Sequence, residues 1–356
     1  MQKALLFLLL LWAPAAAQAQ VDTVRASTLP GPQLAEKAYN SGLASFNAQN
    51  YPVALTSFNQ AIAAKPDFAA AYTNRGATRY ELKDFPQALA DYDQALKLEP
   101  GSYAGYFGRG KVREAQNQPV EADQDYSAAL QAKPDYAPAW YNRGVLRFEK
   151  GDYHAARDDF DNALKADPKM AYAYHDRGSA NQKLDNYAAA TQDYTQALAL
   201  QPELLPALLN RATTERRTGQ LPQALKDYDA YIAKKADNPL AYSNRGSARY
   251  ESKDYAGAIA DFSQAIKIDA TYAFAWNNRA AAQLKLEKYA AAAADAAEAL
   301  KLKPDYAEAY LNRGHAREML RLADEACQDW RKAAELGLTV GNSYAAAAGC
   351  AGEATD

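Results

Sequence analysis

The chain has 356 residues, of which 49% are hydrophobic and 23% are charged, and its formal net charge is −3. This length is sufficient for one large folded domain or two smaller ones. The slightly acidic balance argues against a surface that follows nucleic-acid phosphates, so we expect no nucleic-acid partner.

The first nineteen residues differ from the rest of the chain. Lys3 supplies a positive charge, residues 4–13 form an apolar run, and Ala17-Gln18-Ala19 is a small-x-small cleavage signal. This order predicts a secretory signal peptide over residues 1–19. The apolar run is short for a bilayer span, and a retained membrane anchor is the alternative. We therefore expect an exported protein, periplasmic or secreted, with no stable membrane insertion after signal cleavage.

Residues 20–34 are polar, contain Pro30 and Pro32, and predict a flexible lead. Residues 35–338 then repeat with a period of 34 and need no insertions to align. Such periodicity is typical of solenoids, in which each repeat is stable only when it stacks on its neighbours. The nine repeats begin at Ala35, Ala69, Tyr103, Ala137, Ala171, Leu205, Pro239, Ala273 and Ala307.

Small and large residues recur at fixed positions when each repeat is counted from its first residue. Position 20 is always alanine, position 8 is glycine or alanine, and positions 4 and 24 are mostly aromatic. This alternation suits two closely packed helices. Turn-forming residues at positions 15–17 and a proline at position 32 of six repeats predict where the two helices end. Each repeat is therefore expected to contain helix A, a tight turn and helix B.

Repeat four shows the pattern best, and reads APAWYNRGVLRFEKGDYHAARDDFDNALKADPKM over residues 137–170. The pattern resembles the tetratricopeptide repeat family over residues 35–338. The resemblance implies an all-α fold, a right-handed α-α superhelical solenoid with helix A of each repeat on the concave side. It also implies a non-catalytic scaffold for protein interactions, without identifying the partner.

Position 7 departs from that family's usual apolar residue. It is arginine in repeats two to nine, and position 23 is aspartate in the same eight repeats, whereas repeat one has Ser41 and Ser57. Because the two residue types occur together, and an unpaired buried charge is costly, we predict intra-repeat ion pairs. An exposed arginine row that binds anionic ligands is the alternative. The predicted pairs are Arg75–Asp91, Arg109–Asp125, Arg143–Asp159, Arg177–Asp193, Arg211–Asp227, Arg245–Asp261, Arg279–Asp295 and Arg313–Asp329.

Position 6 is asparagine in seven repeats, and Gly108 and Asp176 interrupt this row. Some superhelical relatives carry such a row on the concave wall, where it holds an extended peptide through amide donors and acceptors. The alternative is that these amides only satisfy nearby backbone groups or neighbouring repeats. With the flanking aromatic residues, the predicted peptide-binding set is Asn40, Asn74, Asn142, Asn210, Asn244, Asn278, Asn312, Tyr39, Phe46, Phe107, Tyr141 and Phe148.

Residues 339–356 follow the last repeat and are expected to form a C-terminal cap and tail, because the end of a solenoid needs cover. The chain has two cysteines, Cys327 and Cys350. In an oxidising compartment we expect them to form a disulfide, and two buried free thiols are the alternative.

No catalytic, cofactor or metal motif is present, and His154, His175 and His315 lie far apart in the sequence. We therefore expect no enzymatic activity and no cofactor. The leading hypothesis is an adaptor that binds a protein or peptide in a concave groove. A glycan-binding solenoid in polysaccharide export and a structural spacer without a groove ligand are the alternatives.

Overall fold

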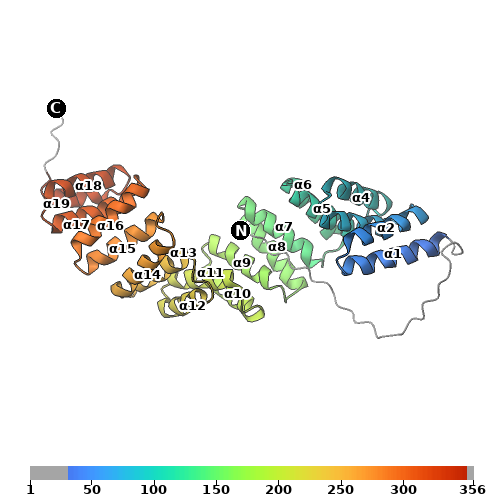
Figure 1. The fold of residues 1–356 in the computed structure, drawn as a ribbon, viewed down its shortest axis with the longest axis horizontal. Helices are drawn as coiled ribbons and strands as arrows, with labels where there is room; N and C mark the ends of the chain where they lie inside the picture. Colours follow the sequence, from blue (N-terminus) through green and yellow to red (C-terminus); the bar gives the residue numbers. More distant parts are fainter. Residues whose placement is uncertain (1–30, 351–356) are drawn as a thin grey trace, which may run out of the picture. The chain divides into compact units, whose positions relative to one another are not determined.

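The computed structural model describes residues 31–350, and these form nineteen α-helices and no β-strand (Figure 1). The predicted signal peptide and residues 20–30 of the predicted lead lie outside the described residues. The chain divides between Gln118 and Pro119 into two compact bodies. We call residues 31–118 the N-terminal body and residues 119–350 the C-terminal body.

In the N-terminal body, each helix packs against the next one in the chain, and helices A of successive repeats also touch. Its helices are α1 (Gly31–Asn47), α2 (Tyr51–Ala64), α3 (Ala69–Glu81), α4 (Phe85–Leu98) and α5 (Tyr103–Ala115).

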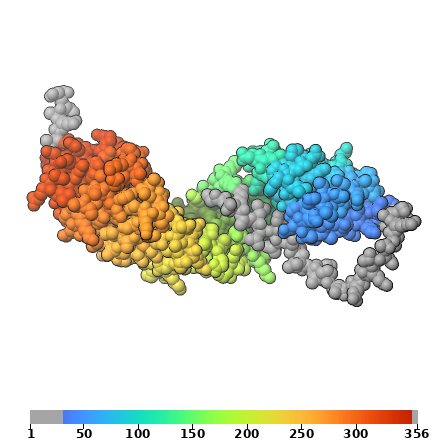
Figure 2. Space-filling model, in the orientation of Figure 1, coloured from blue at the N-terminus to red at the C-terminus, as the bar shows by residue number. Residues whose placement is uncertain are grey.

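The C-terminal body continues the same alternation, so its sequence colours follow one another in bands along the surface (Figure 2). Its helices are α6 (Pro119–Ala132), α7 (Ala137–Lys150), α8 (Tyr153–Ala166), α9 (Ala171–Lys183), α10 (Tyr187–Leu200), α11 (Leu205–Arg217), α12 (Leu221–Lys234), α13 (Pro239–Glu251), α14 (Tyr255–Ile268), α15 (Ala273–Lys285), α16 (Tyr289–Leu302), α17 (Ala307–Met319), α18 (Ala323–Glu335) and α19 (Val340–Ala347).

In repeats two to nine, helix A begins at the first residue of the repeat, as the periodicity predicts. Repeat one differs, because α1 begins at Gly31 rather than Ala35. The prediction of a flexible lead was therefore wrong for residues 31–34. Pro32 suits the first turn of a helix, where its missing N–H needs no partner, and it extends α1 towards the N-terminus.

Helices A and B approach closely in repeats where position 8 is glycine and position 24 is aromatic. A Cβ atom on Gly144 would lie 2.8 Å from the ring of Phe160, and one on Gly314 would lie 2.5 Å from the ring of Trp330. Phe160 and Trp330 are both fully buried. A larger residue in place of Gly144 or Gly314 would therefore push the two helices of its repeat apart.

The turn between helices A and B has the same backbone conformation in all nine repeats. Position 15 has a positive φ between 57° and 89° in each of them. Glycine adopts this left-handed region without a steric cost, but only two repeats use glycine there. The nine residues are Gln49, Lys83, Asn117, Gly151, Asp185, Gly219, Lys253, Glu287 and Arg321.

We predict that Lys253→Gly and Glu287→Gly each raise the free energy of unfolding by roughly 0.5–1 kcal/mol, because glycine relieves the left-handed strain. Chemical denaturation followed by circular dichroism measures the change. The reverse substitution, Gly151→Ala, is the matched control and is expected to destabilise by a similar amount. A loss of stability in both glycine variants would contradict the strain argument.

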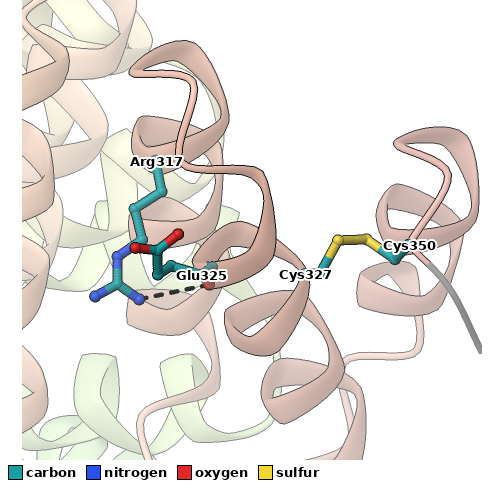
Figure 3. The surroundings of a disulfide bond; sticks show 4 residues. All are labelled: Arg317, Glu325, Cys327 and Cys350. Atoms are coloured by element: carbon teal, nitrogen blue, oxygen red, sulfur yellow. Dashed lines mark hydrogen bonds between the residues drawn. A yellow bond between two sulfur atoms is a disulfide. The ribbon is translucent and has the colours of Figure 1, made fainter. Parts of the chain in front are cut away.

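The last helix, α19, covers the end of the C-terminal body. Tyr344 packs edge-on against His315, with ring centroids 4.4 Å apart, and Ala345 is buried beside Trp330. A disulfide joins Cys327 on α18 to Cys350 after α19, with the two Cα atoms 5.7 Å apart (Figure 3). Burial in this cluster lowers the pKa of His315. Among the described helices, none is long and apolar enough to cross a membrane.

Candidate functional site

The structure brings seven of the eight predicted arginine–aspartate pairs together, at nitrogen–oxygen distances of 2.6 to 2.8 Å. The aspartate side chains in these pairs are at most 10% exposed. Arg109 and Asp125 belong to different bodies, so that pair stays a prediction. The arginines are therefore engaged inside the repeats, which argues against an exposed row for anionic ligands.

Seven of the eight position-7 arginines also bond to helix B of the preceding repeat. Arg143 donates to Asp159 in its own repeat and to the Ser127 hydroxyl on α6, at 2.8 Å. Its guanidinium carbon lies 4.8 Å from the centre of the Trp140 ring. The same three contacts recur in repeats two, five and seven. Position 7 therefore ties adjacent repeats together as well as the two helices of one repeat.

A second arginine, at position 11, was not predicted from the sequence. Arg147 lies 3.0 Å from Asp159, and Arg249 lies 3.0 Å from Asp261. Arg79 and Arg317 contact the position-23 aspartates of their own repeats in the same way. The signal was visible, because position 11 is arginine in five repeats. In four repeats the aspartate therefore sits between two guanidinium groups.

We predict that Asp159→Ala lowers the free energy of unfolding by roughly 3–5 kcal/mol, because it removes a buried carboxylate and leaves two half-buried arginines without it. The neighbouring Asp158→Ala is the matched control. Asp158 has a side chain that is 64% exposed, and its loss should cost no more than about 1 kcal/mol. Urea denaturation of both variants measures the difference. Equal losses of unfolding free energy in the two variants would show that burial of the ion pair adds nothing to stability.

The position-6 row lies on helices A, and several of its members bond to position 5 of the preceding repeat. Asn74 donates to the Tyr39 hydroxyl at 2.9 Å, and Asn312 donates to Asn277 at 2.8 Å. Such bonds were the alternative interpretation of the row, and the structure contains them. Gly108 interrupts the row because a Cβ atom there would lie 2.3 Å from the Tyr92 ring.

In repeats four to six these bonds join into one chain. Asp176 accepts from the Tyr141 hydroxyl and from His175 Nδ1, both at 2.8 Å. With its proton on Nδ1, the neutral His175 ring accepts at Nε2 from Asn210, at 3.2 Å. Polar side chains of three successive helices A are thereby held in fixed orientations.

The remaining members of the predicted set are placed less uniformly. Asn142 lies 3.5 Å from the Tyr126 hydroxyl, Asn278 accepts from Asn277, Asn40 is exposed and Asn244 is half-buried. Phe46 packs against Tyr51, and Phe148 packs against Tyr153, in both cases across the turn of one repeat. Burial raises the pKa of Tyr39, which packs against Phe58 and Phe68. Phe107 is half-buried. Tyr39, Phe46 and Phe148 thus pack against aromatic residues of their own repeats.

Repeat six has Glu215 at position 11, where four other repeats place an arginine against the aspartate. Glu215 is 7% exposed, and its Oε2 has no hydrogen-bond partner among the described residues. Burial, together with the nearby Asp227 carboxylate, raises the pKa of Glu215 to about 7, although Arg211 opposes this shift. Repeat six therefore holds a carboxyl group that titrates near neutral pH.

We predict that the unfolding free energy of repeat six falls as the pH rises from about 4.5 to 7, because the folded state holds the Glu215 proton more tightly than the unfolded state. Glu215→Gln removes this titration, so the variant should be more stable than the wild type at pH 8, by on the order of 3 kcal/mol. Hydrogen exchange in α11 and α12 at several pH values measures this. If hydrogen exchange in α11 and α12 changed with pH in the same way in the wild type and the variant, the assignment of this titration to Glu215 would be refuted.

No group of three or more histidine, cysteine or acidic side chains within residues 31–350 could hold a metal ion. Figure 3 shows that the disulfide lies at the outer side of α18, away from Arg317.

The family comparisons agree with this repeat structure. A family model described as Tetratricopeptide repeat matches residues 69–102 and 137–170, and another of the same description matches residues 171–204. A model described as TPR repeat matches residues 246–287. A search of curated proteins found no significant match.

Solved structures with the same fold include YrrB, a TPR protein with an unusual peptide-binding site, at 21% identity and a TM-score of 0.50 over 52% of this chain and 95% of that one. The C-terminal part of a TPR repeat-containing protein from Cytophaga hutchinsonii has 19% identity and a TM-score of 0.55 over 67% of this chain and 98% of that one. The Cut9–Hcn1 assembly has 15% identity and a TM-score of 0.53 over 88% and 76%.

The paired helices, their 34-residue spacing and these likenesses define an α-helical repeat protein. Residues 69–102, 137–204 and 246–287 are tetratricopeptide repeats by these matches, and the described residues have the fold of that family.

Proposed function

We propose that this protein is a non-catalytic scaffold that binds a protein or an extended peptide segment along the helix A surface. Tetratricopeptide repeat folds are typical of protein–protein interaction scaffolds, and YrrB, which shares the fold, has a peptide-binding site. The helix A surface comprises positions 5, 6, 9 and 12 of successive repeats. We propose that this surface is the concave groove expected from the sequence.

The observation that carries the proposal is the orientation of the position-6 amides. In Asn74, Asn210 and Asn312 the Nδ2 atom bonds to position 5 of the preceding repeat. Their Oδ1 atoms make no hydrogen bond to another described residue. Each of these oriented acceptors, on helices A of repeats two, six and nine, can meet a backbone N–H group of an extended peptide, which is a strong donor that needs a partner. This arrangement supports binding of a peptide backbone with little reading of its side chains.

The aromatic residues favour a peptide over a glycan. A glycan groove uses a continuous aromatic surface, but Phe46, Phe148 and Tyr250 each pack against an aromatic residue of their own repeat. We also infer that the protein works outside the cytoplasm. A disulfide between Cys327 and Cys350 suits an oxidising compartment, and the signal-like N-terminus supports the same location.

We predict that changing Asn142, Asn210 and Asn244 together to alanine weakens peptide capture by at least about tenfold, because each lost hydrogen bond costs roughly 0.5–1.5 kcal/mol. The measurement is enrichment from a displayed library of extended peptides, with an oligosaccharide array in parallel. The matched control changes Asn162 and Asn342, which lie on α8 and α19 outside the row. Unchanged peptide capture would remove the position-6 row from the proposal, and enrichment of oligosaccharides alone would favour the glycan function.

A further inference from the structure

A polar cavity of about 390 Å³ opens between α8, α9 and α10, in the C-terminal body. Its walls include Asp161 from α8, Arg177 and Asn181 from α9, and Ala189 and Asp193 from α10. None of these residues belongs to the helix A surface, because Arg177 and Asn181 occupy positions 7 and 11. The cavity is therefore separate from the surface of the proposed peptide site. We call it the repeat-five cavity.

The equivalent place in other repeats holds a guanidinium group. In repeat seven, Arg249 at position 11 lies 3.0 Å from Asp261 and donates to the backbone oxygen of Gly257, at position 19, at 3.4 Å. In repeat two, Arg79 bonds Asp91 at 2.6 Å and the backbone oxygen of Gln87 at 3.3 Å. Repeat nine has the same two contacts, from Arg317 to Asp329 and to the backbone oxygen of Glu325. The position-11 guanidinium thus lies between position 19 and position 23.

Repeat five has Asn181 at position 11, and the two groups that would receive a guanidinium both line the cavity. Asn181 donates to Asp193 Oδ2 at 2.9 Å, and Ala189 is the residue at position 19. An asparagine side chain is shorter than an arginine side chain by three atoms along its length. It satisfies part of the hydrogen-bonding capacity of Asp193 but does not fill the space that arginine occupies in repeats two, seven and nine. The cavity therefore has the position and the walls of a guanidinium site.

The charges agree with this geometry. In repeat seven, Arg245, Arg249, Asp261 and the preceding Asp229 form a group with no net charge. In repeat five, the corresponding Arg177, Asp193 and Asp161 carry one net negative charge. At the rim, Arg157 is held by Asp158 at 2.7 Å, and Lys165 pairs with Asp161 from the solvent side. In repeat five the charge is therefore balanced by a lysine whose side chain is 69% exposed, whereas in repeat seven it is balanced by a second guanidinium beside the position-23 aspartate.

We propose that the repeat-five cavity binds the guanidinium group of an arginine side chain presented by a partner protein. The partner's arginine takes the place that Arg79, Arg249 and Arg317 take in their own repeats. It donates to Asp193 and to the backbone oxygen of Ala189. Arginine is preferred over lysine because these acceptors suit a planar fork of donors rather than a single ammonium. The scaffold then has a second binding point, on the helix B side.

The test is a titration of the full mature protein with N-acetyl-arginine amide at low salt, followed by the methyl NMR signal of Ala189. N-acetyl-lysine amide and free arginine are titrated in parallel. We expect a saturable shift with the blocked arginine, and affinity at least about tenfold weaker for the blocked lysine. Asn181→Arg supplies the guanidinium from within the chain, so it should abolish the shift. Four other repeats already carry arginine paired at this position, so the variant should keep its fold, which a thermal melt checks.

Two controls separate this site from the proposed peptide surface. Asn181→Ala leaves the cavity open and should still bind the blocked arginine, and Asn210→Ala on the helix A surface should bind it like wild type. No saturable shift, or a shift that survives Asn181→Arg, would overturn the proposal. Equal binding of lysine would overturn its guanidinium specificity, and a clear preference for free arginine would overturn the protein partner. Peptide capture by the helix A surface is unaffected by any of these outcomes.

Discussion

The repeat structure depends on the ion pair made by the buried aspartate at position 23. A carboxylate that is almost fully removed from water must be paired, because its desolvation costs several kcal/mol. The position-7 arginine pairs with it, stacks on the aromatic residue at position 4 and reaches the helix B of the preceding repeat. One side chain therefore joins the two helices of a repeat and fixes that repeat against its neighbour.

The side chain at position 11 then determines which group contacts that aspartate in addition to the position-7 arginine. Arginine completes the group in repeats two, four, seven and nine. Asparagine in repeat five leaves a polar cavity, and glutamate in repeat six adds a second carboxyl beside Asp227. Repeats five and six, which are adjacent, thus differ from the other repeats through the residue at position 11. Local variation of this kind is tolerated because each repeat contacts only its neighbours.

The helices divide the polar side chains into two groups with different environments. Positions 7 and 11 of helix A point into the repeat and meet helix B, where charged groups are paired and buried. Positions 5 and 6 lie on the helix A surface, where Tyr141, Asp176, His175 and Asn210 form a hydrogen-bonded chain across three repeats. The first group stabilises the stack. The second group keeps polar atoms oriented and partly exposed, as a binding surface requires.

The sequence by itself determined the repeat length, the helix boundaries of repeats two to nine and the pairing of position 7 with position 23. These follow from a strict period, because equivalent residues in a solenoid occupy equivalent surroundings. Only the tertiary structure decided which side chains meet between repeats. The bond from Asn74 to Tyr39 and the cavity beside Asn181 depend on how helices of neighbouring repeats stack, and residues 35 positions apart carry no local signal of contact. The start of α1 at Gly31 was likewise decided outside the repeat pattern, because the preceding segment has no equivalent elsewhere in the chain.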